Sequence, residues 1–432
     1  MIGTNKRIYL DYAATTPLDE GVFKAMRPYF SDIFGNPGSL HSFGQEAMGA
    51  IDKSREAIAK MLEVDFRDVI FTSSATEANN LVLRGIVKAT RMTRMASELS
   101  EKRHSEHSDY LPRVIVSAVE HDSVLKTTRD MEQEGLIELK ILPVDEEGVV
   151  SLPELKKLLN DKTVLVSVMY ANNEIGTIEP ISKIGAEIAK FRATGTYPLF
   201  HTDAVQALQY LDCRPNELGV DFMTISGHKI YGPKGVGALI MGRKTHNIKQ
   251  GASGTKQDSR LSVPWSMLQA QITGGGQEFG LRSGTENVAN IVGLAEAVRV
   301  SEKIKQEEAK RIFGLRNYFW EKIVLINRKA RLNGPDVRGG EKYARLPNNI
   351  NVYLPGVLAE EALTYLDMQG VAVSTGSACS ARGAEPSHVL RAMFGDDKIA
   401  RHSLRITLGR GTDRRQVDVA LGAIRKLVES AG

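Results

Sequence analysis

Cysteine is scarce in this sequence: the 432 residues include only Cys213 and Cys379. Two thiols cannot form the framework of a disulfide-rich secreted protein, so a reducing compartment is expected. Apolar runs such as VLVSVMYA at 164–171 are far shorter than the ~20 residues of a membrane helix. The first residues, MIGTNKRIYLDY, lack the apolar core of a signal peptide. We therefore expect a cytoplasmic protein without a membrane partner.

An excess of charge of one sign is also missing, since the formal net charge is +4. No stripe of arginine and aromatic residues, no repeat and no low-complexity tract is present, so no nucleic-acid partner is expected. A hydrophobic fraction of 42% and a charged fraction of 25% are typical of a globular protein. A chain of this length usually divides into two domains.

Apolar runs of strand length alternate with helix-like stretches over the first two-thirds of the chain. Strands are expected at 69–74, 114–121, 139–145, 164–173, 197–203, 222–228 and 237–242. Strands that are almost continuously apolar and separated by helices predict an α/β fold, with a mainly parallel seven-stranded sheet covered by helices on both faces.

A long helical region that reaches about Leu325 leads into smaller units. Strands at 348–355, 371–374 and 403–409 and a helix at 360–370 predict a smaller α+β domain. We place the large domain at 16–303 and the small domain at 1–15 and 304–432. Two polar stretches, 91–113 and 243–263, are expected to be exposed, mobile surface insertions.

Polar side chains follow five of the seven strands. In an open parallel sheet, ligands bind outside the carboxyl ends of the strands. The residues at these positions are Ala75, Thr76, Glu77, His121, Asn172, Asn173, Asp203, Gln206, Ser226, His228 and Lys229.

Lys229 and Asp203 have the most specific chemistry of this group. A lysine amine with a lowered pKa can form an imine with an aldehyde, although a lone lysine is also compatible with a solvated loop. A carboxylate that emerges from a buried strand needs a cationic partner. For Asp203 this partner is a protonated pyridine nitrogen, an internal salt bridge, or instead a helix N-terminus that it caps.

A phosphate and an aromatic ring suit the neighbouring positions. Thr76 begins a helix directly after a strand, where the helix dipole attracts anions, and Ser226 and His228 can also hold a phosphate. His121 can stack on a ring and exchange protons near neutral pH, or it is a core histidine. An aldehyde, a phosphate and a pyridinium together indicate a pyridoxal phosphate site. We expect no bound metal.

Longer motifs support this interpretation. They are YLDYAATTP (9–17), FGNPGSLHSFG (34–44), FTSSATEANN (71–80), ANNEIG (171–176), SGHKIYGPKG (226–235), GGGQE (274–278), RSGTEN (282–287), STGSACS (374–380) and SLRITLGR (403–410). In this set and order, the sequence resembles the class V aminotransferase-like, fold-type I pyridoxal phosphate enzymes. More narrowly, it is similar to the cysteine desulfurases of the NifS/IscS type.

The resemblance implies a role for each position. Lys229 would bind the cofactor's aldehyde, His121 would stack on its ring and shuttle protons, and Asp203 would pair with its pyridine nitrogen. Gln206 would hydrogen-bond the phenolic oxygen, and Arg405 would hold the substrate carboxylate near Asn173. The remaining contacts to the cofactor would come from Ala75, Thr76, Ser226 and His228, and from Thr285 reaching into the partner subunit of a homodimer.

Cys379 lies among glycine, serine and alanine, whereas buried cysteines usually have large apolar neighbours. The resemblance implies that its thiolate takes sulfur from L-cysteine as a persulfide and that L-alanine is released. Residues 375–388 would form the long cysteine loop of the group I enzymes. The persulfide would then pass to an acceptor protein for iron–sulfur cluster assembly or thiolation. Cys213 is interpreted as a small structural or half-exposed residue.

Other functions are also compatible with this fold and cofactor. Selenocysteine lyase is the alternative, because it shares the fold, the cofactor and a cysteine in this loop. An aminotransferase or decarboxylase fits the cysteine motif less well, and a protein that only delivers sulfur would not need Lys229 and His121. Two features depart from the family pattern: Ser74 replaces a usual glycine, and no extended tail follows the last helix, which leaves delivery to an iron–sulfur scaffold open.

Overall fold

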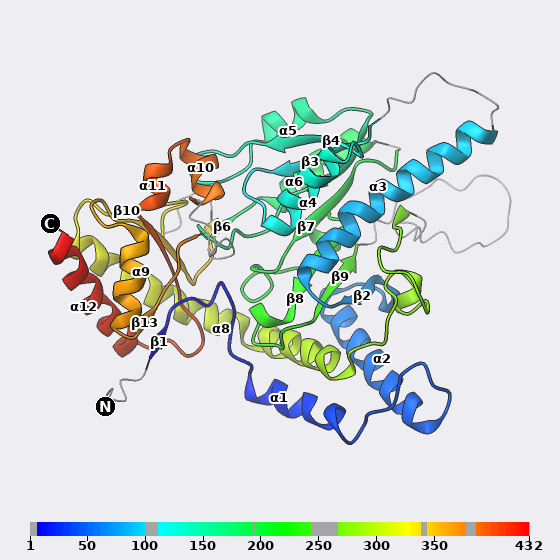
Figure 1. The fold of residues 1–432 in the computed structure, drawn as a ribbon, viewed down its shortest axis with the longest axis horizontal. Coiled ribbons are helices and arrows are strands. Elements are labelled where there is room, and N and C mark those ends of the chain that lie inside the picture. Colours follow the sequence, from blue (N-terminus) through cyan, green and yellow to red (C-terminus); the bar gives the residue numbers. More distant parts are fainter. Residues whose placement is uncertain are drawn as a thin grey trace.

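A computed structural model describes residues 7–100, 111–193, 195–242, 267–337, 344–376 and 386–431 (Figure 1). Its main feature is the seven-stranded sheet expected from the sequence. The strands, in spatial order, are β2 (Val69–Thr72), β9 (Gly237–Met241), β8 (Phe222–Ser226), β7 (Leu199–Asp203), β5 (Thr163–Ser167), β3 (Arg113–Ser117) and β4 (Glu138–Leu142). β9 runs antiparallel to both of its neighbours, β2 and β8, and the other six strands of this sheet run in one direction. The carboxyl ends of the other six strands therefore share one edge.

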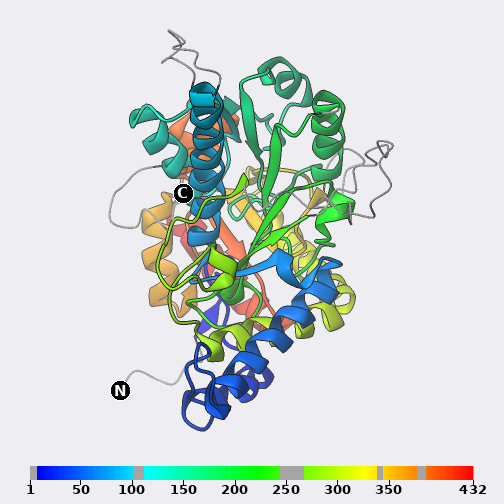
Figure 2. The ribbon, with the colours of Figure 1, turned by 90° about the vertical axis from the view of Figure 1, so that its right-hand side faces the viewer.

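Helices cover both faces of the sheet because successive strand side chains point to opposite faces. In β3, Val114 and Val116 pack with α3 (Ala75–Ser100) and α4 (Asp122–Gln133). Ile115, between them, faces the cluster built with α2 (Ser42–Leu62) and α6 (Ile181–Arg192). Figure 2 shows the strands between α3 and α6.

The stretch 91–113, expected to be an exposed insertion, begins as a helix, since α3 continues through it to Ser100, and Arg91, Met92 and Thr93 are exposed. The segment RMTRMASELS (91–100) contains neither glycine nor proline and is rich in helix-forming residues. Adding residues to an established helix is far easier than starting one, so the helix extends beyond the sheet. The second expected insertion, 243–263, lies outside the described residues.

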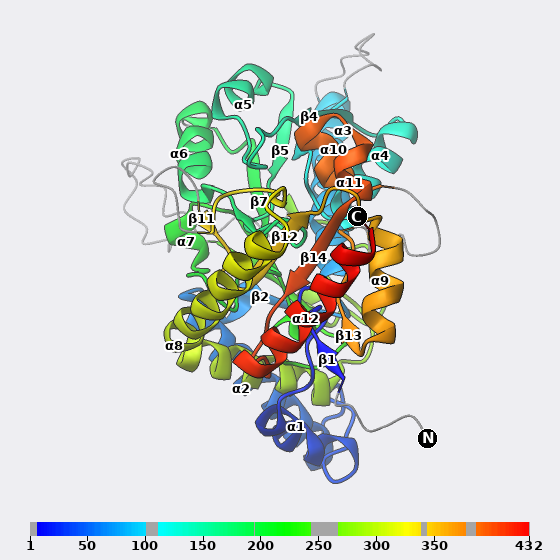
Figure 3. The same cartoon turned by 90° about the vertical axis from the view of Figure 1, so that its left-hand side faces the viewer.

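The smaller unit also has the strands expected from the sequence. β12 (Asn349–Tyr353) lies between β10 (Arg331–Leu332) and β14 (Ser403–Thr407), and β1 (Ile8–Tyr9) pairs in parallel with β13 (Val371–Ala372). Helices α9 (Ala359–Met368) and α12 (Arg414–Ala431) lie side by side against these strands (Figure 3). The shorter elements are α1 (Glu20–Met26), η1 (Arg27–Phe30), η2 (Phe66–Asp68), α5 (Leu152–Leu158), β6 (Thr177–Ile178), α7 (Pro215–Leu218), η3 (Gly227–Lys229), η5 (Glu278–Gly280), β11 (Ala344–Arg345), α10 (His388–Phe394) and α11 (Asp397–Arg401).

One helix, α8 (Val288–Ile326), connects the two units. Its first turns pack with α1 and α2, and Ile291 and Leu294 belong to the core beside the large sheet. Its later residues Ile312 and Phe319 belong to a separate core with β1, β12 and β14. The predicted domain boundary at 303 therefore falls within a continuous helix.

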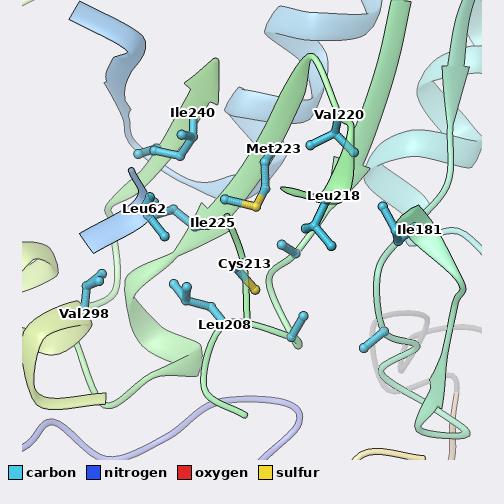
Figure 4. Packing of buried hydrophobic residues seen from close by; sticks show 14 of the residues in the cluster. Leu62, Ile181, Leu208, Cys213, Leu218, Val220, Met223, Ile225, Ile240 and Val298 are labelled. Atoms are coloured by element: carbon cyan, nitrogen blue, oxygen red, sulfur yellow. The ribbon is translucent and has the colours of Figure 1, made fainter. Parts of the chain in front are cut away.

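Cys213 lies in the core beside the large sheet, with Leu208, Leu218 and Met223 around it (Figure 4). Burial raises the pKa of its thiol to about 12. The interpretation of Cys213 as a structural residue is confirmed. Within the described residues, no helix is both long and apolar enough to cross a membrane.

Candidate active site

Lys229 ends η3, directly after β8, and its side chain reaches the N-terminal segment of the chain. Its Nζ donates hydrogen bonds to the carbonyls of Ala13 and Ala14, both at 2.7 Å. Gln206 Nε2 donates to the same Ala13 carbonyl at 2.9 Å. Two of the predicted site residues, from loops after different strands, therefore meet at one backbone oxygen.

His228, next to Lys229, contacts the same segment. Its Nδ1 lies 3.1 Å from Thr15 Oγ1, and its carbonyl accepts hydrogen bonds from the amide and hydroxyl of Thr16. Burial, with additional repulsion from Lys229 and Lys234, lowers the pKa of His228 to about 4. This imidazole is therefore neutral near pH 7 and offers an anion a hydrogen bond without a charge.

Asp203 ends β7 and is only 5% exposed. Its Oδ2 accepts a hydrogen bond from Asn79 Nδ2 at 2.9 Å, and its Oδ1 accepts one from the Val205 amide at 3.0 Å. Both donors are neutral, and within the described ranges no cation forms an ion pair with this carboxylate. The site therefore has room, in electrostatic terms, for a cation beside Asp203.

Asn79 also connects Asp203 to His121. The same Asn79 Nδ2 donates to Ser123 Oγ at 2.8 Å, and Ser123 Oγ lies 2.9 Å from His121 Nδ1. Because the Ser123 amide donates to His121 Nδ1 at 3.1 Å, this nitrogen is an acceptor and a neutral ring carries its proton on Nε2. His121 is at the same time the N-cap of α4.

Arg405, in β14, reaches the large unit from the smaller one. Its Nη2 donates to Asp11 Oδ1 at 2.8 Å and its Nη1 donates to the Asn173 carbonyl at 3.2 Å. The side chain is nearly fully buried, and its Nε has no hydrogen-bond partner among the residues that the structure describes. A guanidinium with an unused donor and only one carboxylate partner can bind a second carboxylate.

The start of α3 lies at the same edge of the sheet, after β2. Ala75 and Thr76 are its first two residues, and Thr76 is exposed. Ser74, which replaces a usual glycine, accepts a hydrogen bond from the Glu77 amide at 3.1 Å. Ser74 thus satisfies one of the free amides at the helix start and leaves the others available to an anion. Ser226 ends β8 and is buried.

Two of the predicted site residues, Cys379 and Thr285, are not part of the contacts described above. Cys379 lies outside the described residues. Thr285 is exposed between η5 and α8, and its role toward a partner subunit stays a prediction.

Analysis of the sequence missed Asn79, Ser123 and Asp11. All three lie inside or next to motifs that were recognised: Asn79 is one turn after Thr76, Ser123 is two residues after His121, and Asp11 belongs to YLDYAATTP. Their proximity to these motifs could have marked them as candidates, but their contacts depend on the fold.

Pyridoxal phosphate fits the arrangement. A buried carboxylate whose partners are neutral accommodates a protonated pyridine nitrogen, and Lys229 lies in η3, directly after β8, the strand that pairs with β7 beside Asp203. The free amides at the start of α3 suit a phosphate.

Comparison with known proteins gives the same result. The family model for aminotransferase class-V matches residues 8–419. A protein named cysteine desulfurase IscS, from Dictyoglomus turgidum, is 42% identical over 425 residues, which cover 98% of this chain and 95% of the relative. A solved structure named NifS-like protein has a TM-score of 0.79 at 33% identity, over 98% of this chain and 100% of its own. A structure of SspA in complex with cysteine has a TM-score of 0.70 at 33% identity, over 93% of this chain and 98% of its own. The chain therefore belongs to the aminotransferase class-V family and is related over nearly its full length to the cysteine desulfurases of the NifS/IscS type.

Proposed function

We propose that the chain is a pyridoxal phosphate-dependent cysteine desulfurase that acts on L-cysteine. The Cys379 thiolate attacks the substrate sulfur, the substrate Cβ–S bond breaks, and a sulfur–sulfur bond forms. The carbon skeleton takes up a proton and leaves as L-alanine, and the enzyme keeps one added sulfur as a persulfide. The observation that carries the proposal is the convergence of Lys229 and Gln206 on the Ala13 carbonyl, beside the buried Asp203.

Three side chains hold the ring of the cofactor in this proposal. The bound cofactor supplies an electron sink that labilises bonds next to the substrate amino group. Lys229 would bind its aldehyde carbon, and Asp203 would keep its pyridine nitrogen protonated through a charge-assisted hydrogen bond. Gln206 donates to its phenolic oxygen.

His121 would stack on the ring of the bound cofactor and would transfer protons. Its Nδ1 is engaged by Ser123, so the proton that it gives and takes is on Nε2. A histidine titrates near neutral pH, which suits both directions of transfer. Lys229, once its amine is free, is the second group that can carry a proton between substrate atoms.

The phosphate is held by hydrogen bonds. Ala75 and Thr76 offer the amides of the α3 N-terminus, and Ser226 and the neutral His228 offer side-chain donors. Thr285 of the partner subunit would donate to the same phosphate.

The substrate carboxylate binds Arg405, with Asn173 beside it. The free Nε of Arg405 and its planar guanidinium suit a bidentate contact, which fixes the orientation of the substrate over the cofactor.

We also infer a homodimer of two-domain subunits, with domains at 16–303 and at 1–15 plus 304–432. Five large apolar side chains are exposed on the segment that includes α1 and the start of α2: Phe23, Phe30, Phe34, Leu40 and Phe43. Exposed apolar surface of this kind usually marks an interface. The enzyme acts in the cytoplasm and passes its sulfur to an acceptor protein, with an iron–sulfur scaffold as a candidate.

Mass spectrometry of the Cys379 peptide tests the function. The holoenzyme is treated briefly with L-cysteine without reductant, and alanine release is measured in parallel. A peptide heavier by one sulfur atom, with an equal amount of alanine, supports the proposal. Cys379→Ala should abolish both products and Cys213→Ala should keep them. An unmodified peptide without alanine would overturn the proposal, and a product from selenocysteine alone would assign the chain to the lyases.

A further inference from the structure

Glu174 lies in the turn after β5, between the site residue Asn173 and β6, and none of the roles above uses it. It is only 4% exposed. A buried carboxylate costs stability unless its contacts compensate. The contacts of Glu174 lead to Gly376 and Ser387, the two ends of the segment 376–387, which contains Cys379 and is called the cysteine segment below.

The far end of the cysteine segment is tied to Glu174 by a hydrogen bond. Ser387 Oγ donates to Glu174 Oε2 at 2.5 Å, and the same Oγ accepts from the Leu390 amide at 3.1 Å. Ser387 is the N-cap of α10 and is 4% exposed. Because the hydroxyl has a single proton, the carboxylate sets its orientation and thereby the start of α10.

The near end of the cysteine segment packs on the same carboxylate. A Cβ built on Gly376 would lie 1.9 Å from Glu174 Oε2 and 2.8 Å from Glu174 Cδ. Only a glycine can approach this closely, so the backbone of residue 376 lies directly against the carboxylate. Just before it, Ser374 forms a two-way backbone pair with Arg405.

The backbone of Glu174 is fixed from three sides. Its amide donates to Asn172 Oδ1 at 2.8 Å, and its carbonyl accepts from Asn349 and Asn351, both at 3.1 Å. These two asparagines belong to β12 of the smaller unit and are buried. One residue earlier, the Asn173 carbonyl accepts from Arg405. Glu174 is therefore rigid and adjacent to the group that we assign to the substrate carboxylate.

We infer that Glu174 is a positioning residue for sulfur transfer: its carboxylate holds both ends of the cysteine segment at a fixed place beside the substrate site. The inference rests on the proposed function, since it concerns the residue that receives the sulfur. Loss of the carboxylate frees the Ser387 hydroxyl and opens a space against Gly376. Substrate binding through Arg405 is retained, whereas the approach of Cys379 to the substrate sulfur becomes less frequent.

The test separates substrate binding from sulfur transfer. The holoenzyme and the variants Glu174→Ala, Ser387→Ala and Ser387→Thr are mixed with L-cysteine. The change in cofactor absorbance reports binding, and quenched samples report persulfide on Cys379. We expect Glu174→Ala and Ser387→Ala to slow persulfide formation by about 10- to 100-fold, because small misplacements of a reacting group cost that much. Ser387→Thr keeps the hydroxyl and should stay close to the wild type, and binding should be unchanged in all three.

Controls make the result specific. Glu179→Gln is a matched variant, since Glu179 is also a buried carboxylate in this region, 2% exposed, but bonds the Val150 amide instead. It should transfer sulfur at the wild-type rate. The double variant Glu174→Ala/Ser387→Ala should be no slower than the slower single variant, because both remove one interaction. If Glu174→Ala does not fold, the Ser387 pair alone decides the question.

Wild-type persulfide rates in both Glu174→Ala and Ser387→Ala would overturn the inference. An equal loss of substrate binding and persulfide formation would overturn it as well, since that result indicates general damage to the site. Failure of the wild-type enzyme to form any persulfide would instead overturn the proposed function.

Discussion

Asp203 is the residue that would pair with the pyridine nitrogen of the cofactor in the proposed function. Its two hydrogen-bond donors, Asn79 and the Val205 amide, are neutral. We expect Asp203→Asn to weaken binding of pyridoxal phosphate by about 10- to 150-fold, because hydrogen bonds between charged groups are worth ~1.5–3 kcal/mol. Absorbance titration of the cofactor-free protein measures this. Asp212→Asn is the control, since Asp212 is an exposed carboxylate paired with Arg214. Equal affinity in wild type and Asp203→Asn would contradict the assignment.

Cys213 should not react with alkylating reagents in the folded enzyme. Burial raises the pKa of Cys213 to about 12, so almost no thiolate forms below pH 10, and the reactive form of cysteine is the thiolate. A short treatment of the folded enzyme with iodoacetamide between pH 7 and 9 should leave Cys213 unmodified, as read from its peptide mass. In denaturant the same residue should react fully. Modification of Cys213 in the folded enzyme, at a rate similar to that in denaturant, would show that the site is accessible.

Single residues also show how far the sequence could predict the site. Motifs placed Lys229, Gln206 and His228 at strand ends, and the structure brings them to one backbone segment. The partners Asn79 and Asp11 could not be identified in this way. Each acts through a contact with a residue more than 100 positions away, and such pairings are set by the fold rather than by local pattern.

Among the elements, the end of β3 and the turn after β5 are joined by Glu120. Its Oε1 accepts from Ser117 Oγ and from the Met169 amide, both at 2.6 Å, and burial raises its pKa to about 8. Between about pH 4.5 and 8 the folded chain retains a proton that the unfolded chain releases. Stability therefore falls as the pH rises through this window.

Glu120→Gln should remove this part of the pH dependence, because an amide imitates the protonated carboxyl without ionising. Urea unfolding at pH 5.5 and pH 8 measures it in wild type and variant. We expect the urea midpoint of Glu120→Gln to rise relative to that of the wild type when the pH is raised from 5.5 to 8. Glu134→Gln, on an exposed side chain, is the control. Parallel pH profiles for Glu120→Gln and the wild type would contradict the role of burial at this residue.

Helix α2, strand β2 and the glycine-rich stretch near η5 meet at one buried ion pair. Arg55 and Glu278 form a bidentate contact at 2.7 and 2.8 Å, and Glu278 also accepts from the Phe71 amide at 2.8 Å. Glu278→Ala should lower the free energy of unfolding by about 3–5 kcal/mol, because it leaves a buried arginine without its partner.

Urea unfolding tests this pair against a surface pair. Asp212→Ala, which breaks an exposed contact with Arg214, should cost less than about 1 kcal/mol. The double variant Arg55→Met/Glu278→Leu should be more stable than Glu278→Ala, because no unpaired charge remains in the core. A Glu278→Ala variant as stable as Asp212→Ala would show that the ion pair is not needed.

At the scale of the whole molecule, the positions of the seven sheet strands along the chain could be predicted, because they follow from hydrophobic patterns in the sequence, whereas their order in the sheet was not predicted. The continuation of α3 through 91–100 was not predicted, since its polar composition is equally typical of a surface loop. The contacts between site residues from different parts of the chain also could not be predicted. Arg405 in β14 contacts Asp11, which follows β1 and forms a bridge with Thr407 of β14, and no local pattern in the sequence encodes that approach.

The proposed dimer predicts that two inactive variants recover activity when they are combined in one mixed dimer. If Thr285 serves the site of the partner subunit, its loss and the loss of Lys229 fall in the same site of a mixed dimer and leave the other site complete. Thr285→Asp puts a negative charge near the partner's phosphate, and Lys229→Ala removes the residue that binds the aldehyde. Each homodimer should be inactive or nearly so. In a mixed dimer, however, the subunit with Thr285→Asp keeps its own Lys229 and receives an intact Thr285 from its partner.

Co-expression of the two variants with different affinity tags isolates the mixed dimer. It should have about half of the wild-type activity per dimer, because one of the two sites is complete in a two-fold symmetric assembly. The same purification of two Lys229→Ala chains is the blank. No recovery in the mixed dimer would place Thr285 at the site of its own subunit. A protein that stays monomeric at assay concentration, as measured by light scattering, would remove the interface and with it the reason for the exposed side chains at Phe34 and Leu40.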